Sequence, residues 1–276
     1  MVVDEDHAAL AAAAAGGAAL CTIVGIEGSF SRRVGAQLAV SPGGEVVGSL
    51  SDGCLEEQVA RDCLECAGPE VRRYGRGSPL IDFRLPCGGG LDILLDPSPD
   101  RAACEQAMDA LADRRLAALP LPAVAGERAA RSYIPRLKIR AFGEGPELAS
   151  LAKVADAAGL AIEAHDKGDL VLGQPAGREP ADMWTAVVLL FHDHEWELAL
   201  LEEALASDAF YIGAQGGRQA RDARLVELAA RGASGEALAR IRSPIGVPAG
   251  SRTPQTLALS ALAEITHAYE RLRPDF

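Results

Sequence analysis

Gly48-Ser49-Leu50-Ser51-Asp52-Gly53-Cys54-Leu55-Glu56 is the stretch around which the first half of this chain is organised. Val46 to Leu50 are typical of a β-strand, and the pattern from Cys54 to about Ala67 predicts a helix. The first backbone N–H groups of a helix are unpaired and favour a negative charge, so a cysteine there tends towards the thiolate form. Cys54 is therefore a candidate reactive thiol. The alternative is a small residue that fills a tight strand–helix junction.

A second unusual segment is Cys87-Gly88-Gly89-Gly90, which comes just before the predicted strand 91–95. Three glycines in a row let backbone N–H groups converge and let a ligand approach the main chain closely. The segment is a candidate ligand loop with a thiol at its start.

All six cysteines lie in the first 104 of the 276 residues, which is too sparse for a secreted fold stapled by disulfides. Cys63 and Cys66 form a CxxC, but they share one helical face with Leu55 and Val59, and no second pair follows at zinc-site spacing. We interpret them as core residues, with a metal or redox role as the alternative. Cys21 and Cys104 are also interpreted as core.

The net charge of −12 argues against binding to nucleic acid or to an anionic membrane, because both require a basic surface. No run of 18 apolar residues and no positively charged leader is present, which predicts neither a membrane span nor a signal peptide. We therefore expect a cytoplasmic protein. An acidic protein can still bind an anionic small molecule in a local basic pocket.

The second half alternates strands with helices, which is typical of a parallel sheet. The expected fold is α/β, with an N-terminal α+β domain at 1–118 and a C-terminal Rossmann-like domain with a mainly parallel sheet at 137–276. A composition rich in proline, beginning with Leu119-Pro120-Leu121-Pro122, predicts a linker over 119–136.

Gly143-x-Gly145 lies between a strand and a helix, and Asp166 ends the next strand, which is a partial dinucleotide fingerprint. Leu148 stands where the third glycine is expected, and Glu144 places a negative charge where phosphates would lie. The pattern supports the fold more than it supports NAD(P) binding.

His192-Asp193-His194-Glu195 follows a buried strand, at the end where open α/β sheets bind ligands. The histidines could hold a metal or act as acid and base, but no third ligand is evident. A hydrogen-bonded structural loop is the alternative.

Four arginines lie in glycine-containing loops and would suit a phosphate or another planar anion. Each one alone is more often a solvated charge, whereas four together point to an anionic ligand. They are Arg32, Arg33, Arg218 and Arg252.

Taken together, these segments resemble the XdhC/CoxI family over residues 18–270. The matching pieces are Glu27-Gly28-Ser29-x-x-Arg32-x-x-Gly35-Ala36, Val47-Gly48-Ser49-x-Ser51-x-Gly53-Cys54-x-Glu56, Cys87-Gly88-Gly89, Gly143-x-Gly145, His192-Asp193-His194-Glu195, Phe210-Tyr211-Ile212-Gly213-Ala214, Pro244-Ile245-Gly246 and Arg252-Thr253-Pro254.

The resemblance implies an accessory protein that does not turn over a metabolite. It would bind the molybdenum cofactor, an anionic phosphorylated pterin, and protect it while a cysteine-desulfurase-type sulfurase installs a sulfur ligand. It would then deliver the cofactor to an apo-molybdenum hydroxylase of the xanthine dehydrogenase family. A homodimer and a cytoplasmic location are also implied.

The resemblance assigns no catalytic residue and no resident metal ligands. The residues it implies in cofactor binding fall in both halves of the chain, and a thiolate is a suitable soft contact for molybdenum. They are Arg32, Ser51, Gly53, Cys54, Cys87, Gly88, Gly89, Gly143, Gly145, Asp166, His192, Arg218 and Arg252.

The chain departs from the family pattern at Asp52, where glycine is usual, and at Glu144 and Pro146 in the dinucleotide turn. Two other functions therefore remain as alternatives. One is an NAD(P)-binding oxidoreductase that uses the Rossmann-like domain, and the other is an interaction protein whose site is vestigial.

Overall fold

The computed structural model describes residues 5–50, 53–78, 88–247 and 253–274. The chain divides into two compact units, Met1–Pro135 with Pro274–Phe276, and Arg136–Arg273. Within the described residues, no helix combines the length and apolar character needed to cross a membrane.

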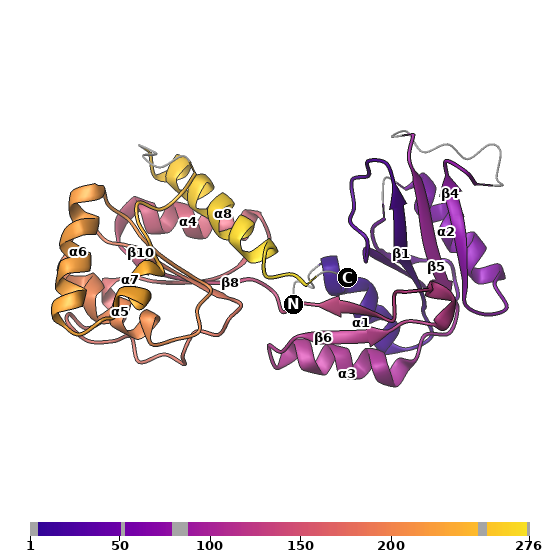
Figure 1. Cartoon of the computed structure of the whole chain (residues 1–276), viewed down its shortest axis with the longest axis horizontal. Coiled ribbons are helices and arrows are strands. Elements are labelled where there is room, and N and C mark those ends of the chain that lie inside the picture. The colour runs from indigo at the N-terminus through magenta and orange to yellow at the C-terminus, as the bar shows by residue number, and fades with distance from the viewer. Residues whose placement is uncertain (1–4, 51–52, 79–87, 248–252, 275–276) are drawn as a thin grey trace. The chain divides into compact units, whose positions relative to one another are not determined.

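The N-terminal unit is built on an antiparallel five-stranded sheet in the order β3-β2-β1-β5-β4 (Figure 1). Its elements are α1 (Glu5–Ala15), β1 (Ala19–Glu27), β2 (Gln37–Val40), β3 (Val46–Gly48), α2 (Cys54–Glu65), β4 (Glu70–Gly75), β5 (Gly90–Asp96), α3 (Arg101–Ala112), β6 (Ala117–Pro120), η1 (Ala123–Ala125) and β7 (Ala130–Tyr133).

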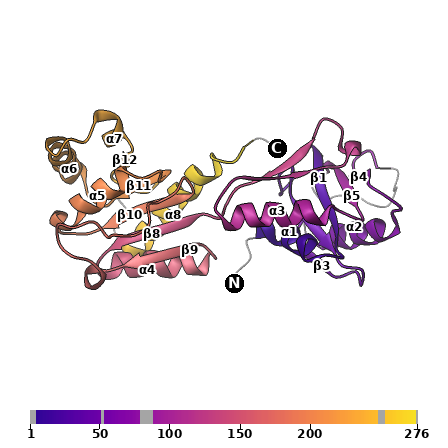
Figure 2. The ribbon, with the colours of Figure 1, turned by 90° about the horizontal axis from the view of Figure 1, so that it is seen from below.

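Helices cover both faces of this sheet. Successive residues of a strand point to opposite sides, and β1 has buried residues on both sides. Cys21 and Ile23 of β1 pack with Leu55 and Val59 of α2. Leu20, which precedes them in the alternation, packs with residues of α1 and α3 on the other face. Figure 2 shows α1 and α3 side by side.

The segment expected to be a linker contains two paired strands. Ala117 to Pro120 of β6 align antiparallel with Ala130 to Tyr133 of β7. The prolines that suggest a linker are compatible with this pairing because the ribbon has only two strands and both are edges. Leu119 and Tyr133 are buried with α1 and α3, and this packing makes the ribbon part of the N-terminal unit.

The C-terminal unit has a parallel five-stranded sheet in the order β12-β11-β10-β8-β9. Its elements are β8 (Lys138–Gly143), α4 (Gly145–Ala157), β9 (Ala161–His165), η2 (Lys167–Asp169), β10 (Thr185–Leu190), η3 (His194–Trp196), α5 (Glu197–Leu205), β11 (Tyr211–Ala214), α6 (Arg218–Ala230), α7 (Gly235–Ala239), β12 (Ile241–Arg242) and α8 (Pro254–Glu270).

This order is that of a doubly wound fold, because the first strand in sequence, β8, lies between the second, β9, and the third, β10. Val187 and Leu189 of β10 pack with Leu201 of α5 and Leu228 of α6. Helices α4 and α8 pack against each other (Figure 1). The predicted α/β fold, with an antiparallel sheet first and a Rossmann-like domain second, is confirmed.

Candidate functional site

The turn that leads into α2 is held by the Glu56 side chain. One carboxylate oxygen accepts a hydrogen bond from the backbone N–H of Gly53 at 2.7 Å, and the other accepts from the backbone N–H of Leu50 at 2.9 Å. Glu56 is only 7% exposed. A glutamate three residues after the N-cap residue can bond back to the chain before the helix, and here it also reaches the end of the preceding strand.

The same turn is hydrogen-bonded to the loop between β1 and β2. The Ser49 hydroxyl lies 3.4 Å from the Glu56 carboxylate and accepts a hydrogen bond from the Arg32 guanidinium at 3.1 Å. Cys54 is the first residue of α2 and is exposed. Arg32 is thus tied to the turn that presents the Cys54 thiol. Ser51 lies outside the described residues.

The glycine run lies at the start of β5, beside the end of β1. Gly90 pairs with Glu27, and the carbonyl of Gly89 accepts the backbone N–H of Arg76 at 2.9 Å. A Cβ atom on Gly90 would lie 2.7 Å from the carbonyl oxygen of Arg76, so only glycine fits there, whereas one on Gly88 would meet open space. Cys87 lies outside the described residues.

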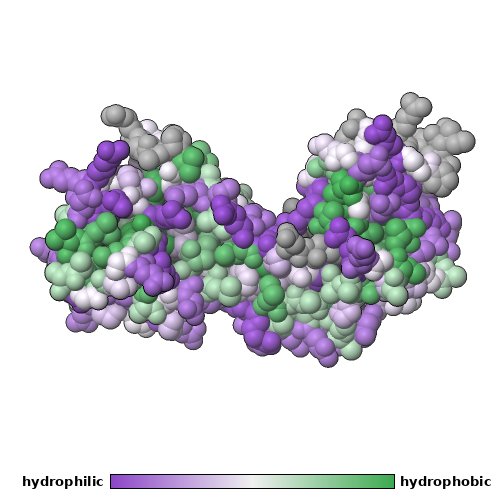
Figure 3. Space-filling model, viewed as in Figure 1, coloured by the Kyte–Doolittle hydropathy of each residue, from purple (hydrophilic) through white to green (hydrophobic). Residues whose placement is uncertain are grey.

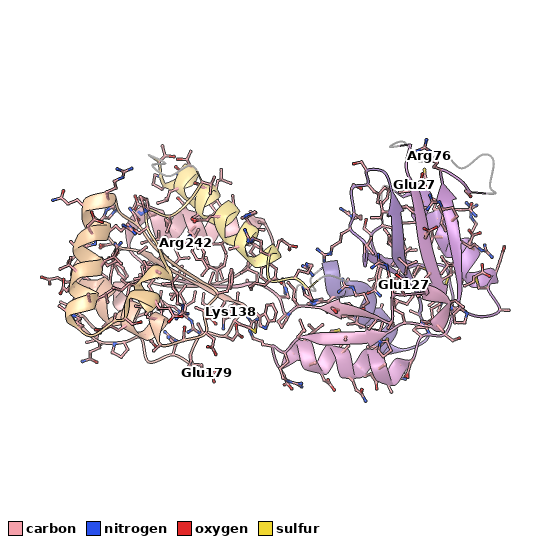
Figure 4. All side chains as sticks on the ribbon, in the orientation of Figure 1. Glu27, Arg76, Glu127, Lys138, Glu179 and Arg242 are labelled. Carbon is pink, nitrogen blue, oxygen red and sulfur yellow. The ribbon has the colours of Figure 1, made fainter. Side chains whose placement is uncertain are left out.

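A group of opposite charges flanks this glycine run. Arg73 of β4 bonds to Glu27 of β1 and to Asp92 of β5, the latter at 3.0 Å, and Arg76 lies 3.6 Å from Glu27. Figure 4 labels Glu27 and Arg76 at the upper end of this unit, and Figure 3 shows hydrophilic side chains there. The ion pairs fasten the β1, β4 and β5 ends around the glycines.

Five of the expected site residues therefore lie at one end of the N-terminal sheet. The antiparallel registers place the ends of β1, β3 and β4 and the start of β5 at this end, and α2 begins there. These residues are Arg32, Gly53, Cys54, Gly88 and Gly89. The soft thiol, the guanidinium and the open glycine backbone are groups that fit an anionic pterin with a soft metal centre.

In the C-terminal unit, Gly143 ends β8, Gly145 begins α4, and His192 follows the end of the neighbouring strand β10. A Cβ atom on Gly143 would lie 2.6 Å from the Leu190 carbonyl oxygen, so this glycine allows the two strands to lie close together. Asp166 follows β9, and its carboxylate accepts the backbone N–H of Gly168 at 2.7 Å. The expected dinucleotide residues thus lie at the carboxyl ends of the strands.

The two histidines of the 192–195 segment contact different partners. His192 Nε2 lies 3.4 Å from Glu147 of α4, and His194 Nδ1 lies 3.0 Å from Glu197 of α5. Across the described ranges, no three His, Cys, Asp or Glu side chains gather in a way that could hold a metal ion. Arg218 is the first residue of α6 and is exposed, whereas Arg252 lies outside the described residues.

Sequence reasoning missed a buried polar network beside His194. Arg224 of α6 donates two hydrogen bonds to one oxygen of Glu197, at 2.7 and 2.9 Å, and another to the carbonyl of Gln215 at 2.8 Å. Glu197 is 0% exposed, and its second oxygen has no hydrogen-bond partner among the described residues. The signal in the sequence is that Glu197 directly precedes the apolar run Leu198-Ala199-Leu200-Leu201. A carboxylate buried with such a run needs a basic partner.

Among the described cysteines, Cys54 is exposed, Cys66 is half-buried and the other three are buried. Cys21 and Cys63 are 0% exposed and share the core between the sheet and α2, and Cys104 is buried on the other face. A hydrogen bond with Cys63, together with burial, raises the pKa of the Cys21 thiol. Burial raises the pKa of the half-buried Cys66 to about 11. The core interpretation of Cys21, Cys63 and Cys104 is therefore confirmed.

Comparisons with known proteins agree with this architecture. A sequence profile described as the XdhC Rossmann domain matches residues 139–265, and one described as the XdhC and CoxI family matches residues 11–75. A solved structure from Bacillus halodurans, titled a xanthine dehydrogenase, is similar with a TM-score of 0.70 and 19% identity. The similarity covers 99% of this chain and 97% of that one, and at this identity it bears on the fold alone.

Two relatives from Escherichia coli K12 are also similar in sequence. The molybdenum cofactor insertion chaperone PaoD is 33% identical over 268 residues, which is 90% of this chain and 82% of PaoD. The uncharacterized protein YqeB is 26% identical over 256 residues, and the match spans 42% of its length. The chain therefore belongs to the XdhC and CoxI family.

Proposed function

We propose that this protein is a chaperone for insertion of the molybdenum cofactor into a molybdoenzyme. The observation that carries the proposal is the 33% identity to PaoD, which extends over 90% of this chain. The exposed Cys54 lies within residues 11–75, which match the XdhC and CoxI family. In this proposal the cofactor is cargo, and the protein binds it, protects it during sulfuration and releases it to an apo-hydroxylase of the xanthine dehydrogenase class.

The proposed binding site is the end of the N-terminal sheet that carries Cys54. The Cys54 thiolate is a soft contact for the metal–dithiolene centre, and the Arg32 guanidinium and the backbone at Gly53, Gly88 and Gly89 suit the phosphate. Cys87 and Ser51, which the family pattern implies, are included in the proposal. A sulfurase partner, a homodimer and a cytoplasmic location also belong to it.

Bound pterin tests this proposal directly. The protein is expressed in a host that makes the cofactor, purified without oxygen and oxidised, so that released pterin is measured by its fluorescence. We expect pterin with the unchanged protein and a loss of most of it in the Cys54→Ser and Cys87→Ser variants. Cys66→Ser is the matched control, because it removes a thiol near the opposite end of α2, where serine can still donate to the Asp62 carbonyl as the thiol does at 3.1 Å.

Two outcomes would contradict the proposal. One is that the unchanged protein holds no more pterin than the double variant Cys54→Ser/Cys87→Ser. The other is that Cys66→Ser loses as much pterin as Cys54→Ser although its folding is intact, since the site would then not depend on the exposed thiol.

A further inference from the structure

The end of the C-terminal sheet where a dinucleotide would bind already carries a negatively charged side chain. Ligands of doubly wound sheets bind at the carboxyl ends of the two strands whose connections leave in opposite directions, here β8 and β10. The turn after β8 is fixed to β10, because Glu144 donates its backbone N–H to the Leu190 carbonyl at 3.2 Å. Glu144 is the N-cap residue of α4, so it lies in the turn where the phosphate of a dinucleotide is expected.

The Glu144 carboxylate contacts a cation and a backbone N–H group at this end of the sheet. One oxygen is 2.9 Å from the Lys167 ammonium, and the other accepts the backbone N–H of His192 at 3.4 Å. Lys167 also lies over the Trp196 ring, 5.2 Å from its centroid, which limits where its ammonium can go. The hydrogen bond from Lys167 lowers the pKa of Glu144, so this carboxylate is ionised at neutral pH.

A second carboxylate adds negative charge near Glu144 and His192. Glu147, in the first turn of α4, lies 3.4 Å from His192 Nε2, and its side chain is 15% exposed. A phosphate at this end of the sheet would have to displace Glu144 from Lys167 and would then lie beside two negative charges. The glycines alone would not prevent binding, because Gly145 has the positive φ of 68° that the turn requires.

We propose that Glu144 is a specificity-determining residue. Its carboxylate binds Lys167 and the His192 N–H and thereby excludes phosphate-bearing ligands from this end of the sheet. Gly145 keeps the positive φ that a nucleotide turn requires, and in this proposal Glu144 is the main group that opposes binding, with Glu147 adding negative charge. The inference concerns the C-terminal unit and does not depend on the cofactor-binding role proposed for the Cys54 turn.

Calorimetric titration with ADP tests this proposal. We expect the unchanged protein to bind ADP with a Kd weaker than ~1 mM, and Glu144→Ala to bind it at least ~10-fold more tightly, because Lys167 is then free. Glu144→Gln, which keeps the size of the side chain and removes its charge, serves as a second variant. The double variant Glu144→Ala/Lys167→Ala should lose the gain.

Glu179→Ala is the matched control, since it removes one exposed negative charge from the same unit (Figure 4). The proposal is overturned if the unchanged protein binds ADP as tightly as Glu144→Ala. It is equally overturned if both Glu144 variants, folded by circular dichroism, gain no more affinity than Glu179→Ala. Pterin retention reports on the other unit, so failure of either proposal is recognised separately.

Discussion

The carboxylate of Glu56 and the backbone N–H of Leu50 are joined by a 2.9 Å hydrogen bond that spans the turn before α2. Leu50 is 0% exposed, so its N–H is shielded from solvent and depends on this acceptor. Because the same carboxylate also accepts the Gly53 N–H, one side chain binds both the end of the preceding strand segment and the residue just before Cys54. The position of the thiol is therefore a property of Glu56 as much as of the helix.

We predict that Glu56→Ala lowers the free energy of unfolding by about 2 kcal/mol, because a buried N–H loses its partner. Glu56→Gln keeps one acceptor oxygen and should lose less. Urea unfolding measures both, and Glu57→Gln, at an exposed position one residue later, is the control that should change little. Equal losses at Glu56 and Glu57 would show that the carboxylate does not hold the turn.

The two glycines on either side of this turn should respond differently to substitution. Gly48 has φ of 95°, and an added Cβ would lie 2.6 Å from the Gln37 carbonyl oxygen; Gly53 has φ of 101°, but its added Cβ would meet open space. In both alanine variants the backbone conformation costs of the order of 1 kcal/mol or more. Only Gly48→Ala also distorts the β2–β3 pairing, so it should have the lower melting temperature of the two.

The sequence predicts the fold because its strongest signals are local. The alternation of strands and helices, with the apolar run 186–191 and the Gly143-x-Gly145 turn, indicates a parallel sheet. Doubly wound sheets occur with more than one strand order, so the order itself comes from the structure. The charges of Lys138 and Arg140 are unusual for a strand within a sheet. The structure accounts for them through Glu163 on β9, which lies 2.7 Å from Lys138 and 3.2 Å from Arg140.

Side-chain partners across the fold are what the sequence does not reveal. Glu144 is recognisable as a negative charge in the dinucleotide turn, but its pairing with Lys167 depends on where the chain goes after β9. Likewise nothing in the sequence joins Glu197 to Arg224, which is 27 residues away. The prolines that predict a linker over 119–136 do not reveal the β6–β7 pairing either. This pairing is stabilised by burial of the two strands against α1 and α3, which is a tertiary effect.

The buried carboxyl group of Asp96 should make the stability of the fold depend on pH. Asp96 is 8% exposed at the end of β5, and burial raises its pKa above the usual 3.8. The native state therefore prefers the protonated form, and this contribution to stability is present below the unfolded pKa and is lost as pH rises through the folded pKa. Asp96→Asn should be more stable than the unchanged protein at pH 7, and the difference should vanish near pH ~3, where the carboxyl is protonated in both states.

Urea unfolding across this pH range measures the effect. Asparagine can keep the hydrogen bond that Asp96 accepts from the Ser98 N–H, so the comparison isolates the charge. Asp109→Asn, at an exposed position of α3, is the control and should show no such dependence. A stability difference between the unchanged protein and the Asp96→Asn variant that stays constant with pH would contradict the prediction.

The buried Glu197–Arg224 pair should be strongly non-additive in a double-mutant cycle. Removing either partner leaves an uncompensated charge in the core, so Glu197→Leu and Arg224→Met should each lose about 3–5 kcal/mol of unfolding free energy. The double variant should recover much of this loss, because neither charge remains. The surface pair Arg231 and Glu227, 3.6 Å apart, provides the comparison, and its coupling should stay below about 1 kcal/mol. If the double variant of the buried pair loses the sum of the two single losses, the pair is not the unit that holds α5 to α6.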